Sequence, residues 1–236
     1  MKQSSTTIEV IGFIRSCFTE KFGIPRQPGL APSAVARLQL IEPFNRREMV
    51  RGLEAFSHVW VQFLFHQAVA DGWKATVRPP RLGGSQRKGI FATRSPHRPN
   101  FIGSSAVKLE KITFVDGVVL ELSGVDLLDG TPVLDIKPYL VSGDRLEDAN
   151  DGWVPKKSVD FTVRFVHEAA IFCDRYQENT GNCLSALIRE VLVQDPRPSS
   201  QREHKDEFGM LLFDVNVRWR IENDICTVLS CEQKPS

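Results

Sequence analysis

The sequence predicts a mainly β N-terminal unit followed by a small α+β unit. Short stretches of alternating apolar and polar residues recur through residues 1–140, and no long helical pattern separates them. Residues 142–157 are rich in Asp, Gly and Asn, which is typical of a connection. Beyond it, two apolar patterns of helical length lie between strand patterns. We therefore place the first domain at residues 1–150 and the second at residues 151–236.

Several strands are expected in the first domain. Alternation predicts them at residues 8–14, 35–41, 57–65, 75–78, 106–114 and 118–122. The third is apolar on both faces, which favours a central position in a sheet. Residues 21–32 form a loop with three prolines, and Asn45 is expected to cap a short helix at residues 46–53. Because strands do not alternate with helices and no Gly-x-Gly-x-x-Gly follows a strand, the pattern does not favour a Rossmann-type domain.

One more strand follows the turn predicted at Asp129-Gly130. Its alternation places Asp135, Lys137 and Tyr139 on one face and the apolar residues between them on the other. The pattern alone leaves two interpretations open, because this face is either polar decoration exposed to solvent or part of a functional site.

The second domain combines strands and helices. A strand is expected at residues 159–166, helices at residues 167–176 and 184–193, and two closing strands at residues 211–219 and 225–230.

Composition indicates an ordinary globular protein. Of the 236 residues, 42% are hydrophobic and 25% charged, so disorder of the whole chain is excluded. No apolar run reaches the roughly 18 to 20 residues that span a bilayer, and the N-terminus lacks the apolar core of a signal peptide, so we expect a cytoplasmic protein without a membrane partner. The cysteines are odd in number and scattered, which predicts reduced thiols and no metal site.

The charges are unevenly distributed along the chain, although the net charge is only +1. No carboxylate occurs between Asp71 and Glu110, whereas many cations do, and the following segment is strongly acidic. A basic surface of this kind is typical of proteins that bind a phosphate backbone, but solvated charge runs are also common.

Residues 88–103 form the most distinctive stretch and read Lys-Gly-Ile-Phe-Ala-Thr-Arg-Ser-Pro-His-Arg-Pro-Asn-Phe-Ile-Gly. Proline fixes φ and glycine permits turns that other residues resist, so the arginines, histidine and asparagine are expected in a shaped polar loop. Each residue by itself is ordinary in a turn. The ordered string is not explained by the needs of a strand or a helix.

This string resembles the signature of the TsaA-like family, which it matches at residues 89–95 and 98–100. Residues 25–29, 51–58, 78–84, 129–139 and 195–198 also resemble that family in its bacterial form. The resemblance implies an antiparallel β-barrel followed by the small α+β domain. It also implies an S-adenosylmethionine-dependent methyltransferase that acts on N6 of threonylcarbamoyladenosine next to the anticodon of threonine tRNA, and a homodimer with the cofactor near the subunit interface.

The resemblance also implies where the ligands bind. The positions assigned to S-adenosylmethionine are Pro25, Arg26, Gln27, His66, Gln67, Arg94, Ser104, Asp126, Leu127, Leu128, Asp129, Gly130 and Thr131. The basic stretch would hold the anticodon arm of the tRNA through Arg81, Lys88, His97, Arg98 and Asn100. The second domain either extends the RNA surface with its arginines or simply caps the barrel.

Asp135, Lys137 and Tyr139 are the candidate catalytic residues. The acceptor nitrogen is conjugated to a carbonyl and is a poor nucleophile until its proton leaves, so Asp135 with Tyr139 could form a base or proton relay. Lys137 could lower the pKa of Tyr139 or bind the carboxylate of the threonyl group. Arg94, His97 or Arg98 could bind that carboxylate instead.

Two other classes of function compete with this interpretation. Charge segregation alone would also suit a non-catalytic RNA- or nucleotide-binding module. A hydrolase built on His58, His66 and His97 is less favoured, because no His-x-x-x-His, His-Glu or Gly-x-Ser-x-Gly arrangement accompanies them.

Overall fold

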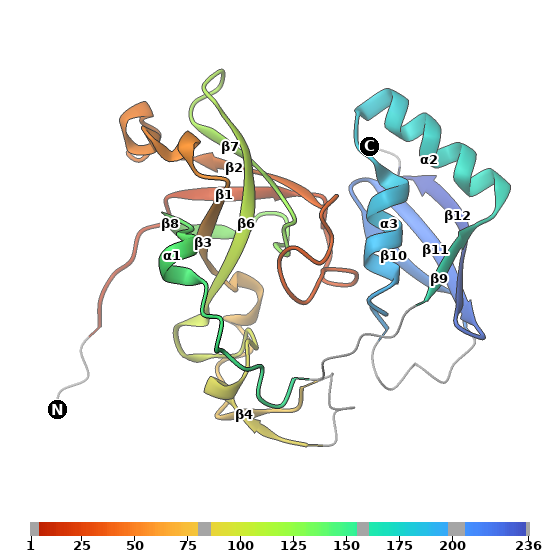
Figure 1. The fold of residues 1–236 in the computed structure, drawn as a ribbon, viewed down its shortest axis with the longest axis horizontal. Coiled ribbons are helices and arrows are strands. Elements are labelled where there is room, and N and C mark those ends of the chain that lie inside the picture. The colour runs from red at the N-terminus through yellow and green to blue at the C-terminus, as the bar shows by residue number, and fades with distance from the viewer. Residues whose placement is uncertain (1–4, 80–85, 155–160, 198–205, 235–236) are drawn as a thin grey trace.

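A computed structural model describes residues 5–79, 86–154, 161–197 and 206–234 of the chain. It confirms a mainly β first unit joined to a smaller α+β second unit (Figure 1). The first unit is a closed antiparallel barrel in which each strand pairs with two neighbours. Around the barrel the order is β1 (Gly12–Ser16), β2 (Val35–Leu40), β7 (Val119–Ser123), β6 (Ile102–Thr113), β3 (His58–Leu64) and β8 (Pro132–Pro138).

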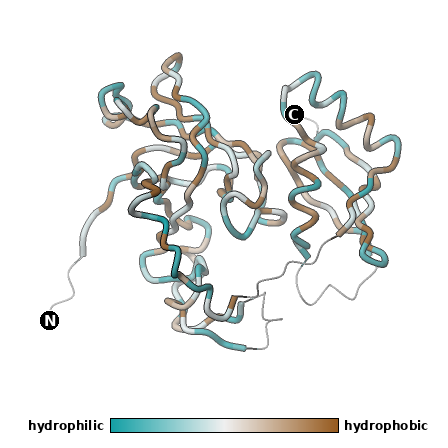
Figure 2. The backbone as a smooth tube through the Cα atoms, in the orientation of Figure 1, coloured by the Kyte–Doolittle hydropathy of each residue, from teal (hydrophilic) through white to brown (hydrophobic). Residues whose placement is uncertain are grey.

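The barrel interior follows from the alternation of the sequence. Val59, Val61 and Phe63 on β3 are buried, while the residues between them are partly exposed. Figure 2 shows the same pattern as short hydrophobic stretches interrupted by hydrophilic ones. Gly103 on β6 lies so close to Phe63 that a Cβ atom there would be 2.4 Å from the ring. The glycine therefore allows the Phe63 ring to cross the neighbouring strand at this end of the barrel.

Three local predictions in the barrel need correction. The first strand starts at Gly12 rather than near residue 8, and the strand predicted at residues 106–114 starts at Ile102. The predicted helix at residues 46–53 is a pair of 3-10 helices, η1 (Arg47–Val50) and η2 (Leu53–Ala55), separated by Gly52 at φ 85°. Asn45 is not its N-cap, because its side-chain oxygen accepts a hydrogen bond from the Val118 amide at 2.5 Å. Tertiary contact with the β6–β7 hairpin thus takes precedence over the local cap.

A long excursion connects β3 with β6 and leaves the barrel at one end. We call residues 65–101 the lobe; its elements are η3 (His66–Ala68), β4 (Thr76–Val77), β5 (Lys88–Gly89), η5 (Ile90–Ala92) and η6 (Pro99–Phe101). The Phe65 amide donates to the Phe101 carbonyl at 2.8 Å, which closes the base of the lobe. The lobe contains the distinctive basic stretch. Arg81 and residues 80–85 around it lie outside the described residues.

Where the structure describes it, the second unit consists of a four-stranded sheet and two helices. The sheet order is β10 (Phe208–Leu212), β11 (Val215–Glu222), β12 (Ile225–Gln233) and β9 (Thr162–Phe165), and the helices are α2 (His167–Thr180) and α3 (Leu184–Leu192). The single strand predicted at residues 211–219 is wrong. Phe213 adopts a positive φ of 55°, and a turn here divides the stretch into the β10–β11 hairpin. A short helix, α1 (Val141–Asp144), follows β8 in the connection between the units.

The Asp-Pro-Arg segment near the C-terminus lies in the core of the second unit. Asp195 and Arg197 are 3% and 5% exposed and form an ion pair with 2.8 Å between Oδ1 and Nε. The guanidinium of Arg197 also lies over the rings of Phe161 and Phe208. This part of the family resemblance therefore reflects packing within the second unit.

Other features agree with the composition. All five cysteines are free, as expected for reduced thiols. None of the helices in the described part of the chain is long and apolar enough to cross a membrane.

Candidate functional site

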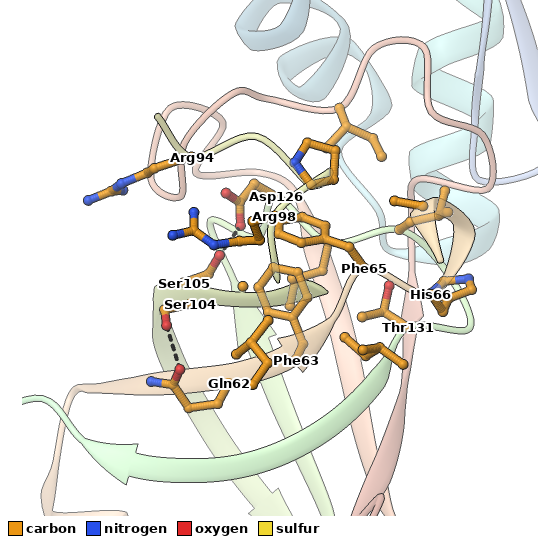
Figure 3. A pocket seen from close by; sticks show the side chains of 18 of the residues that line it. Gln62, Phe63, Phe65, His66, Arg94, Arg98, Ser104, Ser105, Asp126 and Thr131 are labelled. Atoms are coloured by element: carbon orange, nitrogen blue, oxygen red, sulfur yellow. Dashed lines mark hydrogen bonds between the residues drawn. The ribbon is translucent and has the colours of Figure 1, made fainter. Parts of the chain in front are cut away.

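A cavity of about 1060 Å³ opens at the end of the barrel from which the lobe leaves. Most of its walls come from five segments that are distant in sequence: the loop at residues 17–34, the end of β3 with η3, the motif loop of the lobe (residues 89–100), the start of β6 and the β7–β8 connection. Lys137 of β8 and Asp144 of α1 also line it. Figure 3 shows Ser104, Ser105, Asp126 and Arg98 on one side, and His66 and Thr131 on the other. Phe63 and Phe65 provide an apolar floor between the two sides.

The cavity brings together most of the residues predicted to bind the cofactor. The lining includes Pro25, Arg26, Gln27, His66, Gln67, Arg94, Ser104, Asp126, Leu127, Leu128 and Thr131. Two predicted substrate residues, His97 and Arg98, also line it. Their individual roles stay predictions.

Asp129 and Gly130 support the wall behind the cavity rather than lining it. The Asp129 carboxylate accepts a hydrogen bond from the Ser16 amide at 2.9 Å, and the Gly130 amide donates to the Ile14 carbonyl at 2.8 Å. Gly130 has φ 74°, a conformation that other residues adopt with strain. In this structure both residues fix the β7–β8 connection to β1.

The motif loop is held by its own side chains. Thr93 Oγ1 donates to the Ile90 carbonyl at 2.9 Å, and Arg98 Nη1 donates to the Thr93 carbonyl at 3.1 Å. Arg94 donates to the side-chain oxygen of Gln27, which joins the motif loop to the loop at residues 17–34. Asn100 adopts φ 64°, and asparagine is one of the few residues that tolerate this region. The order of residues in the motif therefore has a structural reason as well as a chemical one.

Asp126 is the carboxylate of the cavity with a strongly altered acidity. Ser105 Oγ donates to its Oδ1 at 2.6 Å. Burial raises the pKa of Asp126 to about 6, and the hydrogen bond from Ser105 and the charge of Arg94 only partly oppose this. The site thus contains a carboxyl group that changes charge near pH 6 and that feels the charge of Arg94.

Asp126 is expected to make the protein less stable as the pH rises from about 4 to about 6. In this window the unfolded side chain has lost its proton, whereas the buried one keeps it, so the folded state binds more protons and the free energy of unfolding falls. The change should be about 1 to 3 kcal/mol. Urea unfolding at pH 4 and pH 7 measures it, and Asp126→Asn should remove this part of the pH dependence. An identical pH dependence in the variant would contradict the assignment.

The predicted catalytic residues lie at the edge of the cavity, Asp135 and Lys137 on β8 and Tyr139 directly after it. Lys137 lines the cavity and contacts the Asp135 carboxylate, which confirms that these two share a face. Tyr139 packs beside Trp60, with 5.8 Å between ring centroids. Asp135 and Tyr139 flank the cavity without lining it. Their catalytic role stays a prediction.

Sequence reasoning missed several residues of the site. Trp60 and Gln62 line the cavity from β3, and Gln62 accepts a hydrogen bond from Ser104. The polar Gln62 within an otherwise apolar strand was a signal that could have identified them. Phe91 is 80% exposed on η5, directly before the cavity residues Thr93 and Arg94.

Lys88 and Asn100 belong to the lobe rather than to the cavity lining. The Lys88 ammonium lies 6.0 Å from the centroid of the Trp153 ring, and the Trp153 indole donates to the Ala92 carbonyl at 3.0 Å. Within the described ranges, no group of three or more His, Cys, Asp or Glu residues is placed to hold a metal ion.

Comparisons with known proteins identify the family. The model of the tRNA-methyltransferase O N-terminal domain matches residues 13–145, and that of the TrmO C-terminal domain matches residues 158–234. The tRNA (adenine(37)-N6)-methyltransferase of Escherichia coli is 46% identical over 98% of this chain and 100% of its own length. A Pseudomonas aeruginosa protein, provisionally named the S-adenosylmethionine-dependent methyltransferase RcsF, is 47% identical over 90% of this chain and 91% of its own.

A solved structure agrees with these relatives. The crystal structure of TrmO from Pseudomonas aeruginosa has a TM-score of 0.81 and 40% identity, and the match covers 97% of this chain and 99% of that one. The barrel with its α+β extension is therefore the fold of that protein as well. The chain belongs to the tRNA-methyltransferase O family.

Proposed function

We propose that this protein transfers a methyl group from S-adenosylmethionine to N6 of adenosine 37 in tRNA, and that the acceptor is the threonylcarbamoylated adenosine of threonine tRNA. The cavity at the barrel end carries the proposal, because it gathers Arg94, Asp126 and His66 from separate segments. The relatives that match nearly the full chain support the reaction class by their names.

The lining of the cavity suits the chemical groups of S-adenosylmethionine. Phe63, Phe65 and Leu127 offer apolar surface for a ring, while Arg26 and Arg94 offer positive charge for a carboxylate. The Nδ1 atom of His97 is buried without a hydrogen-bond partner among the residues that the structure describes, so a polar ligand atom could satisfy it. The bound cofactor would supply the methyl group. The protein's part is to hold donor and acceptor in line and to exclude water.

The acceptor is proposed to approach along the β8 edge of the cavity. There Lys137 is available to the carboxylate of the threonyl group, and Asp135 is available to receive the N6 proton through Lys137 or Tyr139. The pairing of Asp135 with Lys137 orients the carboxylate at this edge.

The lobe is proposed to hold the anticodon arm. It carries Lys88, His97, Arg98 and Asn100, and its sequence has no carboxylate after Asp71. Phe91 exposes an aromatic ring beside these residues, which suits an unpaired base. A tRNA substrate also supports a cytoplasmic location, and we retain the homodimer as a proposal.

Phe91→Ala is expected to raise KM for tRNA by about 10-fold, because stacking of one base on an aromatic ring contributes about 1 to 3 kcal/mol. The maximal rate and the affinity for S-adenosylhomocysteine should stay near wild type, and Phe91→Trp should restore KM. Phe114→Ala is the matched control, since Phe114 is a partly exposed ring at the β6–β7 hairpin. An unchanged KM with a shift from dimer to monomer would instead assign Phe91 to a subunit interface.

The reaction is tested with purified protein, S-adenosylmethionine and threonine tRNA with or without the threonylcarbamoyl group. Mass spectrometry of the nucleosides should show a methylated threonylcarbamoyladenosine only in the modified tRNA. A methylated product from unmodified tRNA would show that the threonylcarbamoyl group is not required on the acceptor. The alternative of a non-catalytic RNA-binding module predicts neither a product nor a thermal shift with S-adenosylhomocysteine.

A further inference from the structure

The loop at residues 17–34 carries part of the cavity but has little structure of its own. It contains neither helix nor strand, yet Ile24, Pro25, Arg26 and Gln27 from its middle line the cavity. Barrel contacts hold only parts of it, such as the hydrogen bond from the Gly29 amide to the Gly124 carbonyl at 2.8 Å. A loop of this length needs further contacts to keep a single conformation.

Helix α3 of the second unit supplies such contacts near the end of the loop. Both oxygens of the Glu190 carboxylate accept hydrogen bonds from Ser33, at 2.8 Å from the amide and 2.9 Å from Oγ. One turn further along, the side-chain Nε2 of Gln194 donates to the Leu30 carbonyl at 3.2 Å and to the Glu190 carbonyl at 2.7 Å. The two-point contact orients the carboxylate as well as binding it, and charge-assisted hydrogen bonds are the stronger kind.

The β10–β11 hairpin holds the beginning of the same loop. The Leu211 amide donates to Glu20 at 2.8 Å, and the Phe213 amide donates to the Cys17 carbonyl at 2.6 Å. Three residues after Glu20, Gly23 has φ 92°. It packs against the second unit, because a Cβ atom at this position would lie 3.5 Å from Met210 and 3.7 Å from Val191. Both ends of the loop therefore contact the second unit, and the residues between them line the cavity.

We infer that the second unit acts in the reaction as a brace that positions the cofactor loop, with Glu190 as its main positioning residue. No described residue of the second unit lines the cavity, so any effect of Glu190 on the site must pass through the loop. The inference rests on the proposed function. The second unit would then contribute to cofactor binding. If it were instead part of the RNA surface, it would affect tRNA binding.

The test compares Glu190→Ala with wild type by calorimetric titration of S-adenosylhomocysteine. The dissociation constant is expected to rise by about 10-fold or more, because the loop loses both hydrogen bonds to a charged partner. KM for S-adenosylmethionine should rise in parallel, while KM for tRNA should stay within about twofold. Glu190→Gln should recover much of the affinity, since its amide can still accept from the Ser33 amide.

Two further variants control for folding and surface charge. Ser33→Ala removes one of the two hydrogen bonds without changing α3, and should weaken binding in the same direction but less. Its effect should not add to that of Glu190→Ala, because both variants break the same contact. Glu178→Ala, which removes an exposed carboxylate from α2, should behave as wild type.

Each outcome is decisive. If wild type binds S-adenosylhomocysteine and methylates tRNA, and Glu190→Ala and Ser33→Ala bind it equally well, the brace is refuted and the proposed function stands. A rise in KM for tRNA with unchanged S-adenosylhomocysteine affinity would also refute it and would assign α3 to the RNA surface. If wild type itself fails to bind S-adenosylhomocysteine, the proposed function and the brace both fail.

Discussion

Replacing Asp135 with alanine is expected to slow methyl transfer by about 100-fold or more, which is the usual effect of removing a group that accepts a proton. Asp135 contacts Lys137, and Lys137 lines the cavity, so in the proposed relay the proton of the acceptor would reach the carboxylate through Lys137. Asp135 itself does not line the cavity, and the dissociation constant of S-adenosylhomocysteine should therefore change little. Single-turnover rates with saturating cofactor and tRNA measure the chemical step.

The chain offers a matched control for this experiment. Lys111 and Glu121 form a partly exposed ion pair across β6 and β7, with 3.3 Å between Nζ and Oε2. Glu121→Ala removes a carboxylate from an ion pair on the barrel and should leave the single-turnover rate unchanged. If Asp135→Ala reacts as fast as Glu121→Ala, Asp135 has no part in the reaction.

Replacing Arg197 with methionine is expected to lower the free energy of unfolding by about 3 to 5 kcal/mol, because the buried Asp195 carboxylate loses the guanidinium that pairs with it. Both side chains are almost fully buried, and methionine keeps much of the volume of the arginine stem. Urea unfolding followed by circular dichroism measures the change. Mutating Asp195 to Asn in the same chain should recover part of the loss, since a neutral amide costs less to bury.

Arg220 provides the comparison for Arg197. It pairs with Glu222 at the same spacing of two residues, with 3.8 Å between Nε and Oε1, but both side chains are about half exposed. Exposed pairs contribute less than about 1 kcal/mol, so Arg220→Met should be nearly neutral. Equal losses in the two variants would show that burial of the Asp195–Arg197 pair is not what makes it important.

The strand patterns and the distinctive motif were readable from the sequence because they are local. Period-two alternation predicted β3 and β8, and the order of Pro, Asn and Arg in residues 88–103 predicted a shaped loop. The same local reasoning failed at Asn45 and at Phe213. Asn45 bonds to Val118, which is 73 residues away, and Phe213 turns the chain because the β10–β11 hairpin closes there.

The sequence by itself determined that this protein is mainly β, carries a basic segment without carboxylates, and contains the polar loop of its family. Only the tertiary structure decided which of those residues meet. It joined Asp126 to Ser105, turned Asp129 toward Ser16, and joined Ser33 to Glu190 across 157 residues of chain. The physical reason is that alternation and turn preferences describe neighbours along the chain, whereas a binding site depends on strand register and on contacts between distant segments.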